Sequence, residues 1–244
     1  MAKIAGTPNV ADLDLYTSYS TAPSGIYLGQ RFPGQNGKEF ALVLAGASNL
    51  VAGNLLQSAA NDTQFDDMAV PAAIAVGQDT VTITNGTTTV TAGQFVGGSL
   101  IVSVTPGLGE EYTIVGHGLA TSGTAWVLNL DRPLRTAWTT STKVSVRRSP
   151  YSGVIQFPAT TQTGIPVGVA IYAIPAATYG FIQVKGEVGI LSDGSTFAVG
   201  SQVGTPSGTA GCITVYSAGT TKTSVGNARR AAASGKTIQV MLQL

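Results

Sequence analysis

The sequence predicts an all-β fold, made of short-stranded β-barrel or sandwich domains with an extended N-terminal arm. Apolar residues fall in short runs or alternate with polar ones, and glycines (31 in all) and prolines separate the runs. No window of about eleven residues or more shows helical periodicity. Short strands spaced by such turns are typical of a sandwich or a closed barrel, in which closure removes exposed sheet edges.

Residues 1–39 are predicted to be the extended arm, because they have little periodicity and many Gly and Pro breakers. Aromatic side chains are scattered among the breakers, and Tyr16, Tyr19 and Tyr27 are the anchors that we expect at an interface. The part most typical of an arm between subunits is residues 1–27. The alternative is a meandering segment that packs on its own domain.

A first β segment is predicted over residues 40–64. It contains an apolar strand at 40–44, ended by Gly46, and a turn followed by a strand at 49–56. We expect this segment to pack with the C-terminal domain.

Residues 65–149 are predicted to form a central β-domain, entered through the acidic stretch 61–69. Asn85-Gly86 lies between two alternating runs, 80–84 and 87–91. This pattern predicts a β-hairpin, because both turn residues accept positive φ. Further strands are predicted at 99–105, 111–115, 125–130 and 143–147.

Residues 150–244 are predicted to form a C-terminal β-barrel, after a turn-rich boundary at 149–153. The nearest candidate for a helix is 227–233, which includes an alanine run. Gly200 and Gly226 are expected where strands turn sharply or approach another backbone closely. The strands expected in this domain are 168–174, 179–185, 188–191, 202–204, 211–216 and 237–244.

The composition gives few groups for side-chain chemistry. Charged residues form 10% of the chain, where soluble domains carry about a quarter. The single cysteine, Cys212, excludes an internal disulfide framework and a cysteine zinc site. We therefore expect no enzyme activity and no cofactor, and surfaces that partners cover. The alternative is an ordinary β-protein with a neutral surface.

Net charge and hydropathy also limit which classes of partner are expected. With a net charge of +1, nothing global indicates nucleic acid, and the basic residues do not interleave with aromatic ones. No run of about 18 apolar residues predicts a membrane-spanning helix. The first residues lack the apolar core of a secretory signal, so we expect synthesis and use without that export route.

Three groups of residues are weighed for catalysis or metal binding. His117, the only histidine, stands between two glycines and is interpreted as a loop residue. Glu110 and Glu111 could serve a hydrolase, but nothing in their spacing supports one. The third group is Asp62, Asp66 and Asp67, whose spacing does not match an EF-hand and which we interpret as a solvated linker.

Arginines near predicted strand ends are the candidate partner contacts. Arg132 and Arg135 lie in one short stretch, and Arg147 is followed by Arg148. Because arginine forms forked pairs with carboxylates, these residues suit an acidic face of a partner. The alternative is ordinary surface arginine. Arg229-Arg230, before the alanine run, could face solvent or a neighbour.

Several glycine-containing stretches resemble the capsid decoration (cement) proteins of tailed bacteriophages. They lie at 165–170, 179–184 and 197–201, and again at 224–228, 231–235 and 238–242, where Val-Gly-Asn-Ala precedes Ser-Gly and a final strand. Residues 29–57 also look like phage structural proteins, whereas 65–149 matches the one-barrel members poorly and is expected to be an inserted or additional β-domain.

The resemblance implies a structural virion protein on the capsid exterior, made in the host cytoplasm. It implies a homotrimer that clamps neighbouring subunits of the major capsid protein at local threefold positions. An alternative function is a tail-fibre or host-surface glycan-binding module, in which Trp126, Trp138 and Tyr112 would line a shallow sugar-binding face.

Overall fold

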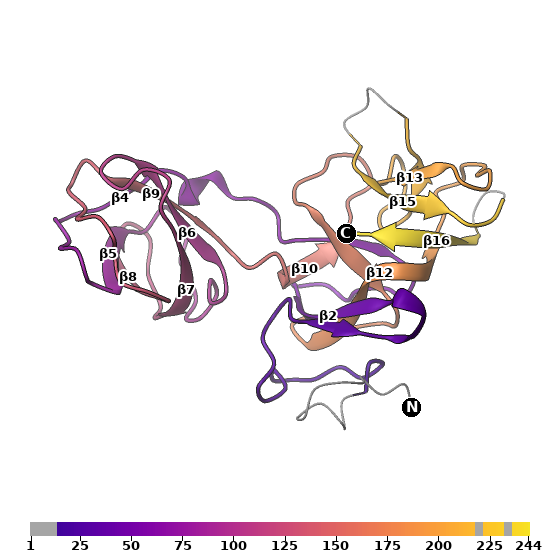
Figure 1. Cartoon of the computed structure of the whole chain (residues 1–244), viewed down its shortest axis with the longest axis horizontal. Coiled ribbons are helices and arrows are strands. Elements are labelled where there is room, and N and C mark those ends of the chain that lie inside the picture. The colour runs from indigo at the N-terminus through magenta and orange to yellow at the C-terminus, as the bar shows by residue number, and fades with distance from the viewer. Residues whose placement is uncertain (1–13, 218–221, 232–235) are drawn as a thin grey trace. The chain divides into compact units, whose positions relative to one another are not determined.

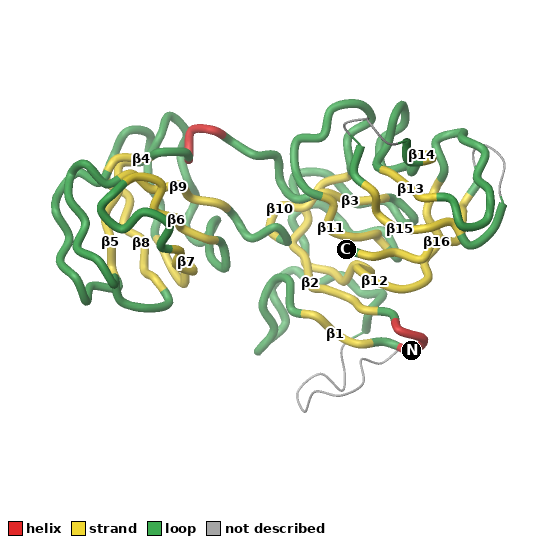
Figure 2. The backbone as a smooth tube through the Cα atoms, turned by 45° about the horizontal axis from the view of Figure 1, so that its top comes forward, coloured by secondary structure: helices red, strands yellow, loops and turns green. Residues whose placement is uncertain are grey.

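The structure is a computed structural model that describes residues 14–217, 222–231 and 236–244. Nearly all of its regular structure is strand, drawn in yellow in Figure 2, so the predicted all-β fold is confirmed. Two 3₁₀ turns, Gln35–Gly37 and Thr63–Phe65, are the helical elements of the described residues. None of these is long or apolar enough to cross a membrane.

The chain divides into two compact units (Figure 1). Unit 1 joins Met1–Ala60 with Pro150–Leu244, and unit 2 is Asn61–Ser149. The first β segment and the C-terminal segment thus belong to one unit, with unit 2 inserted between them in the sequence.

Five strands of unit 1 form a closed ring. In ring order they are β2 (Glu39–Ala45), β10 (Ser152–Gln156), β3 (Leu55–Gln57), β11 (Pro166–Ala170) and β12 (Tyr179–Leu191). Pairing between β12 and β2 closes the ring, and only β2 and β10 run parallel in it.

Alternation along these strands fills the ring with small and β-branched side chains. Ala41 and Val43 of β2 lie in one buried cluster with Ile182 and Val184 of β12. The intervening residues of the same strands point to the opposite face, where the N-terminal segment covers them. Because side chains alternate between the two faces of a strand, β2 and β12 contribute both to the inside of the ring and to the cluster on its outer face.

The described part of the predicted arm packs on its own unit, as the alternative interpretation has it. Leu15, Ile26 and Phe32 are buried against Leu42 and Phe181 on the outer face of the ring. The chain there also forms β1 (Arg31–Pro33), which pairs with β2. Residues 1–13 of the arm lie outside the described residues.

Strand β12 continues beyond the ring into a second sheet. It is one strand where the sequence predicts two, 179–185 and 188–191, because Gly186 bends it at a φ of 87° without ending it. The sheet continues through β16 (Thr237–Gln243), β15 (Ser224–Ala228), β13 (Gln202–Gly204) and β14 (Thr214–Val215).

The nearest candidate for a helix, 227–233, is strand over its first residues. Asn227 and Ala228 belong to β15 and pair with Met241 and Val240 of β16. Ala228 is buried in the core of this sheet, so tertiary pairing overrides the helical propensity of the alanines. Residues 232 and 233 lie outside the described residues.

Unit 2 has one six-stranded sheet around its own core. The strand order is β4-β9-β6-β7-β8-β5. Its largest core side chains are Trp126, Trp138, Tyr112, Phe65 and Phe95. The bounds are β4 Met68–Ala69, β5 Thr80–Thr84, β6 Ser99–Val104, β7 Glu111–His117, β8 Ala125–Leu130 and β9 Lys143–Arg147.

The predicted hairpin at Asn85-Gly86 is wrong. Strand β5 pairs with β8, and residues 87–91 form no strand. The carboxamide of Asn85 explains the difference, because its Nδ2 lies 2.9 Å from the carbonyl oxygens of both Thr88 and Thr121. This buried asparagine fixes a loop through its side chain, where a hairpin would need only its backbone.

Candidate functional site

Two of the predicted interface arginines meet in a surface groove of unit 2. The turn after β8 supplies Arg132 and Arg135, and the turn between β6 and β7 supplies Leu108. The groove has a volume of about 370 Å³. Its lining residues are Leu108, Gly109, Glu110, Glu111, Tyr112, Arg132 and Arg135.

Hydrogen bonds fix the floor of this groove. The Tyr112 hydroxyl donates to Glu110 Oε2 at 2.5 Å and accepts from the backbone N–H of Arg135 at 3.1 Å. Thr136 Oγ1 donates to Glu110 Oε1 at 2.6 Å. Desolvation raises the pKa of Glu110, but the hydrogen bonds from Thr136 and Tyr112 outweigh it, so this pKa lies below its usual value. A glycosidase acid needs a raised pKa, so Glu110 is unsuited to that role.

The two arginines differ in how firmly they are held. The Arg132 guanidinium lies 5.2 Å from the Tyr112 ring centroid, forms a 3.1 Å salt bridge with Asp131 and donates to the carbonyl of Glu111. Arg135 is exposed, and its guanidinium has no hydrogen bond or salt bridge to any described residue. Arg132 is therefore preorganised, whereas Arg135 interacts with the charge of Glu110 but keeps its hydrogen-bond donors for a partner.

The other predicted arginines contact neighbours inside unit 2 and do not line this groove. Arg147 forms a salt bridge with Asp66. The Arg148 guanidinium lies 5.3 Å from the Phe95 ring centroid. Desolvation lowers the pKa of Arg148, and the charge of Asp62 opposes that shift.

The aspartates of the acidic stretch have separate structural contacts. Asp62 caps the 3₁₀ turn by accepting from the backbone N–H of Gln64 at 3.1 Å, and Asp66 pairs with Arg147. Within the described ranges, no three His, Cys, Asp or Glu side chains cluster as metal ligands would.

The interpretation of His117 as a loop residue is wrong, because it is the last residue of β7 and pairs with Leu128 of β8. Its side chain holds a loop to the core of unit 2. Its Nε2 accepts from the backbone N–H of Phe95 at 2.9 Å, and its Nδ1 lies 2.8 Å from the carbonyl oxygen of Gly118. This pattern requires a neutral imidazole with its proton on Nδ1. The ring also packs edge-on against Trp126, with centroids 5.3 Å apart.

Replacing His117 by alanine is expected to lower the stability of unit 2 by about 1–3 kcal/mol, because it leaves the Phe95 N–H without its acceptor. Both tryptophans of the chain, Trp126 and Trp138, lie in unit 2, so urea unfolding followed by tryptophan fluorescence reports on this unit. Leu119→Ala, at an exposed neighbouring position, is the control. An unfolding midpoint unchanged in His117→Ala would contradict the structural role.

The proposed sugar-binding aromatics do not form a surface. Trp126, Trp138 and Tyr112 are each 1% exposed and belong to the core of unit 2. The expectation that they line a shallow face is therefore wrong. Tyr112 and Trp126 occupy inward positions of β7 and β8, and Trp138 packs into the same core from the segment between β8 and β9. Residue type alone does not distinguish the two faces of a sheet.

The tyrosines of the N-terminal segment divide into exposed and packed residues. Tyr16 and Tyr27 are 54% and 71% exposed. Tyr19 pairs with Tyr179 through the backbone and meets Phe181 edge-on at 6.4 Å. Desolvation raises the pKa of Tyr19. Tyr16 and Tyr27 are thus the two predicted anchors whose rings lie mainly at the surface.

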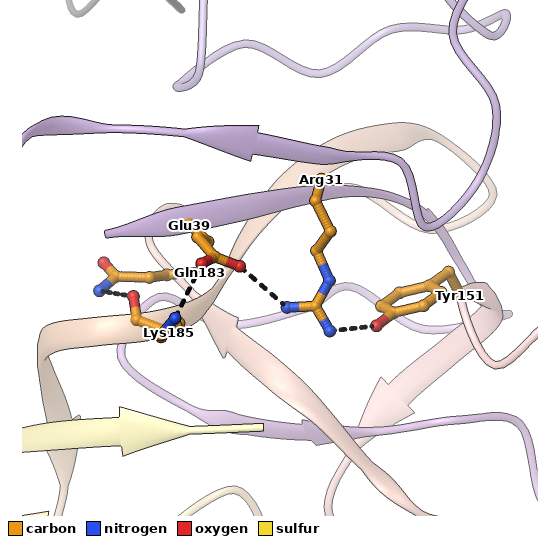
Figure 3. Close-up of polar contacts among 5 residues, drawn as sticks. All are labelled: Arg31, Glu39, Tyr151, Gln183 and Lys185. Carbon is orange, nitrogen blue, oxygen red and sulfur yellow. Dashed lines mark hydrogen bonds and ion pairs between the residues drawn. The ribbon is translucent and has the colours of Figure 1, made fainter. Parts of the chain in front are cut away.

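Sequence reasoning missed a polar row on unit 1 (Figure 3). The Glu39 carboxylate lies 3.0 Å from Lys185 Nζ and 3.8 Å from Arg31 Nη1, and Arg31 Nη2 donates to the Tyr151 hydroxyl at 3.1 Å. Glu39 and Lys185 are cross-strand neighbours on β2 and β12. No local signal predicts this row, because its members lie far apart in the sequence.

Comparisons with known protein families, curated proteins and solved structures find no match to this chain. The geometry by itself defines a two-unit all-β protein with a preorganised arginine groove on unit 2.

Proposed function

We propose that this chain is a structural virion protein that binds the outer surface of a tailed-phage capsid. It stabilises the shell by clamping neighbouring major capsid subunits, acts as a homotrimer and is made in the host cytoplasm. The resemblance of its glycine-containing stretches to capsid decoration proteins motivates the proposal.

The observation that carries the proposal is the groove of unit 2. Arg132 is held in place, Arg135 keeps its hydrogen-bond donors for a partner, and Leu108 beside them is 67% exposed. A cation next to an apolar side chain suits a partner surface that presents a carboxylate beside an apolar group. The two arginines set register, and burial of apolar area stabilises the complex.

Exposed apolar side chains on the sheet of unit 2 support the same function. Ile101, Val115 and Val127 point outward from β6, β7 and β8 and are 38%, 53% and 47% exposed. Thr82 is the cross-strand partner of Val127, and the charged Glu111 is that of Ile101. Apolar side chains bordered by polar and charged ones are typical of an interface.

We propose no enzymatic activity. The groups best suited to catalysis, His117 and Glu110, are held in contacts that stabilise unit 2. The glycan-binding alternative loses its predicted face, because Trp126, Trp138 and Tyr112 are buried.

Arg135→Glu is expected to weaken binding to shells assembled from the major capsid protein of the same virus by about tenfold, because charge reversal repels the partner carboxylate. Co-sedimentation measures the affinity. Lys143→Glu makes the same charge change in unit 2 outside the groove and serves as the control.

Light scattering on the wild-type chain is expected to give a trimer. A monomer at micromolar concentration that does not sediment with shells would overturn the proposed function. Equal loss of binding in Arg135→Glu and Lys143→Glu would remove the groove from the contact.

A further inference from the structure

A second groove lies on unit 1, along the outward side of β12. It has a volume of about 350 Å³. Its walls come from segments far apart in the sequence: the N-terminal segment, the start of β2, the turn before β3, β11, β12 and β16. Its lining includes Tyr16, Lys38, Gly53, Gln183, Gly189 and Gln239.

Gln183 gives this groove an unpaired acceptor. The residue is 2% exposed, and its Nε2 donates to the carbonyl oxygens of Lys185 at 3.0 Å and Glu187 at 2.9 Å; Figure 3 shows the first contact. Both amide hydrogens are thus used by the bulge where β12 changes partners. Oε1 accepts from no described residue, so a ligand that donates a hydrogen bond would satisfy it.

Lys38 gives the groove an unpaired cation. Its side chain is half-buried, and its ammonium has no hydrogen bond or salt bridge to a described residue. Glu187, the acidic residue of the lining, is already paired with Arg229. The uncompensated charge is therefore positive and suits an anionic group.

The remaining walls suit a flat ring. Tyr16 offers a largely exposed aromatic face. The floor has no side chain at Gly53, where a Cβ would meet only the Gly189 carbonyl oxygen, at 4.0 Å, whereas the Thr237 methyl group lies over Gly189. A flat ligand can therefore lie close to the backbone.

We propose that this groove binds a short saccharide that carries a carboxylate, of the uronic acid type. A sugar ring lies against Tyr16, a hydroxyl donates to Gln183 Oε1, and the carboxylate pairs with Lys38. The exposed Gln239 carboxamide both donates and accepts, as neighbouring hydroxyls require. A few placed polar groups beside apolar walls are typical of small-ligand sites. This activity is independent of the proposed capsid-binding function.

The test is titration of the full chain with digalacturonic acid and with α-1,4-galactobiose, the neutral disaccharide of the same linkage and configuration, followed by saturation-transfer NMR. Digalacturonic acid is expected to bind more tightly than galactobiose. Gly53→Asn fills the groove, and asparagine tolerates the φ of 78° found there, so affinity is expected to fall by at least about tenfold. Gly200→Asn, at a φ of 81° with open space around it, is the matched control and retains binding.

Tyr16→Ala and Gln239→Ala are surface changes that also weaken binding, so the inference stays testable if Gly53→Asn does not fold. The inference is overturned if the wild-type chain binds neither disaccharide, or if Gly53→Asn and Gly200→Asn bind alike. Loss of shell binding in Gly53→Asn, without saccharide binding by the wild type, would assign the groove to a protein contact. That outcome overturns the saccharide site and leaves the proposed function standing.

Discussion

Replacement of Trp126 by alanine is expected to lower the free energy of unfolding of unit 2 by about 3–5 kcal/mol. The side chain is 1% exposed and packs against Phe95, Phe65 and His117, with ring centroids 5.1, 6.1 and 5.3 Å away. Truncation removes the buried area of a large aromatic ring and leaves a cavity that rigid strands cannot collapse. Both terms destabilise.

Urea unfolding followed by the fluorescence of Trp138 measures this loss, because Trp138 remains in unit 2 as the reporter. Leu119→Ala is the control, since this side chain of unit 2 is 64% exposed, and its effect is expected to stay within about 0.5 kcal/mol. A Trp126→Ala chain as stable as the wild type would mean that the ring faces solvent. The sugar-binding face would then return as an explanation.

Strands with local signals could be predicted closely from the sequence. The predictions 125–130 and 143–147 coincide with β8 and β9, because clean alternation is bracketed there by turn residues. The hairpin predicted at Asn85-Gly86 is wrong because contacts distant in the sequence override the local signal. Its signal was strong, but Asn85 is buried and bonds distant carbonyls, and β5 takes β8 as its partner.

Pairings between distant segments could not be predicted. The ring of unit 1 closes between β2 and β12, and the N-terminal segment covers the outside of these strands with Leu15 and Phe32. The same Gly, Pro and aromatic residues suit both an arm between subunits and a segment that packs on its own unit. Composition therefore left both interpretations open, and only the tertiary contacts decide between them for the described residues.

The two candidate sites also differ in whether neighbouring or distant parts of the sequence form them. Arg132 and Arg135 meet in one groove because a single turn carries both, so the sequence could predict them together. The groove of unit 1 assembles Tyr16, Lys38 and Gln183 from three segments. In the sequence, Gln183 has the pattern of an ordinary strand residue. Its Nε2 is held by carbonyl oxygens of the bulge beside it, and this fixes the position of its Oε1 acceptor.

Gly226→Ala is expected to be the most damaging single-methyl change in unit 1, with a loss of about 3–5 kcal/mol. Gly226 lies on β15 at a φ of 157°, opposite Leu242 of β16. A Cβ at this position would lie 2.1 Å from the Met241 carbonyl oxygen. Because that oxygen belongs to the backbone of the partner strand, relief requires β15 and β16 to separate over the core that they cover.

Gly200→Ala measures the cost of alanine at a positive φ where an added Cβ makes no close contact. Gly200 has a φ of 81° but nothing within 4 Å of an added Cβ, so alanine costs about 1 kcal/mol there. The tryptophans do not report on unit 1, so thermal unfolding by far-ultraviolet circular dichroism and amide hydrogen exchange of β15 and β16 measure both variants. Equal effects would show that backbone conformation alone requires glycine at 226. A much larger effect at 226 would show that close approach of the two strands selects this residue.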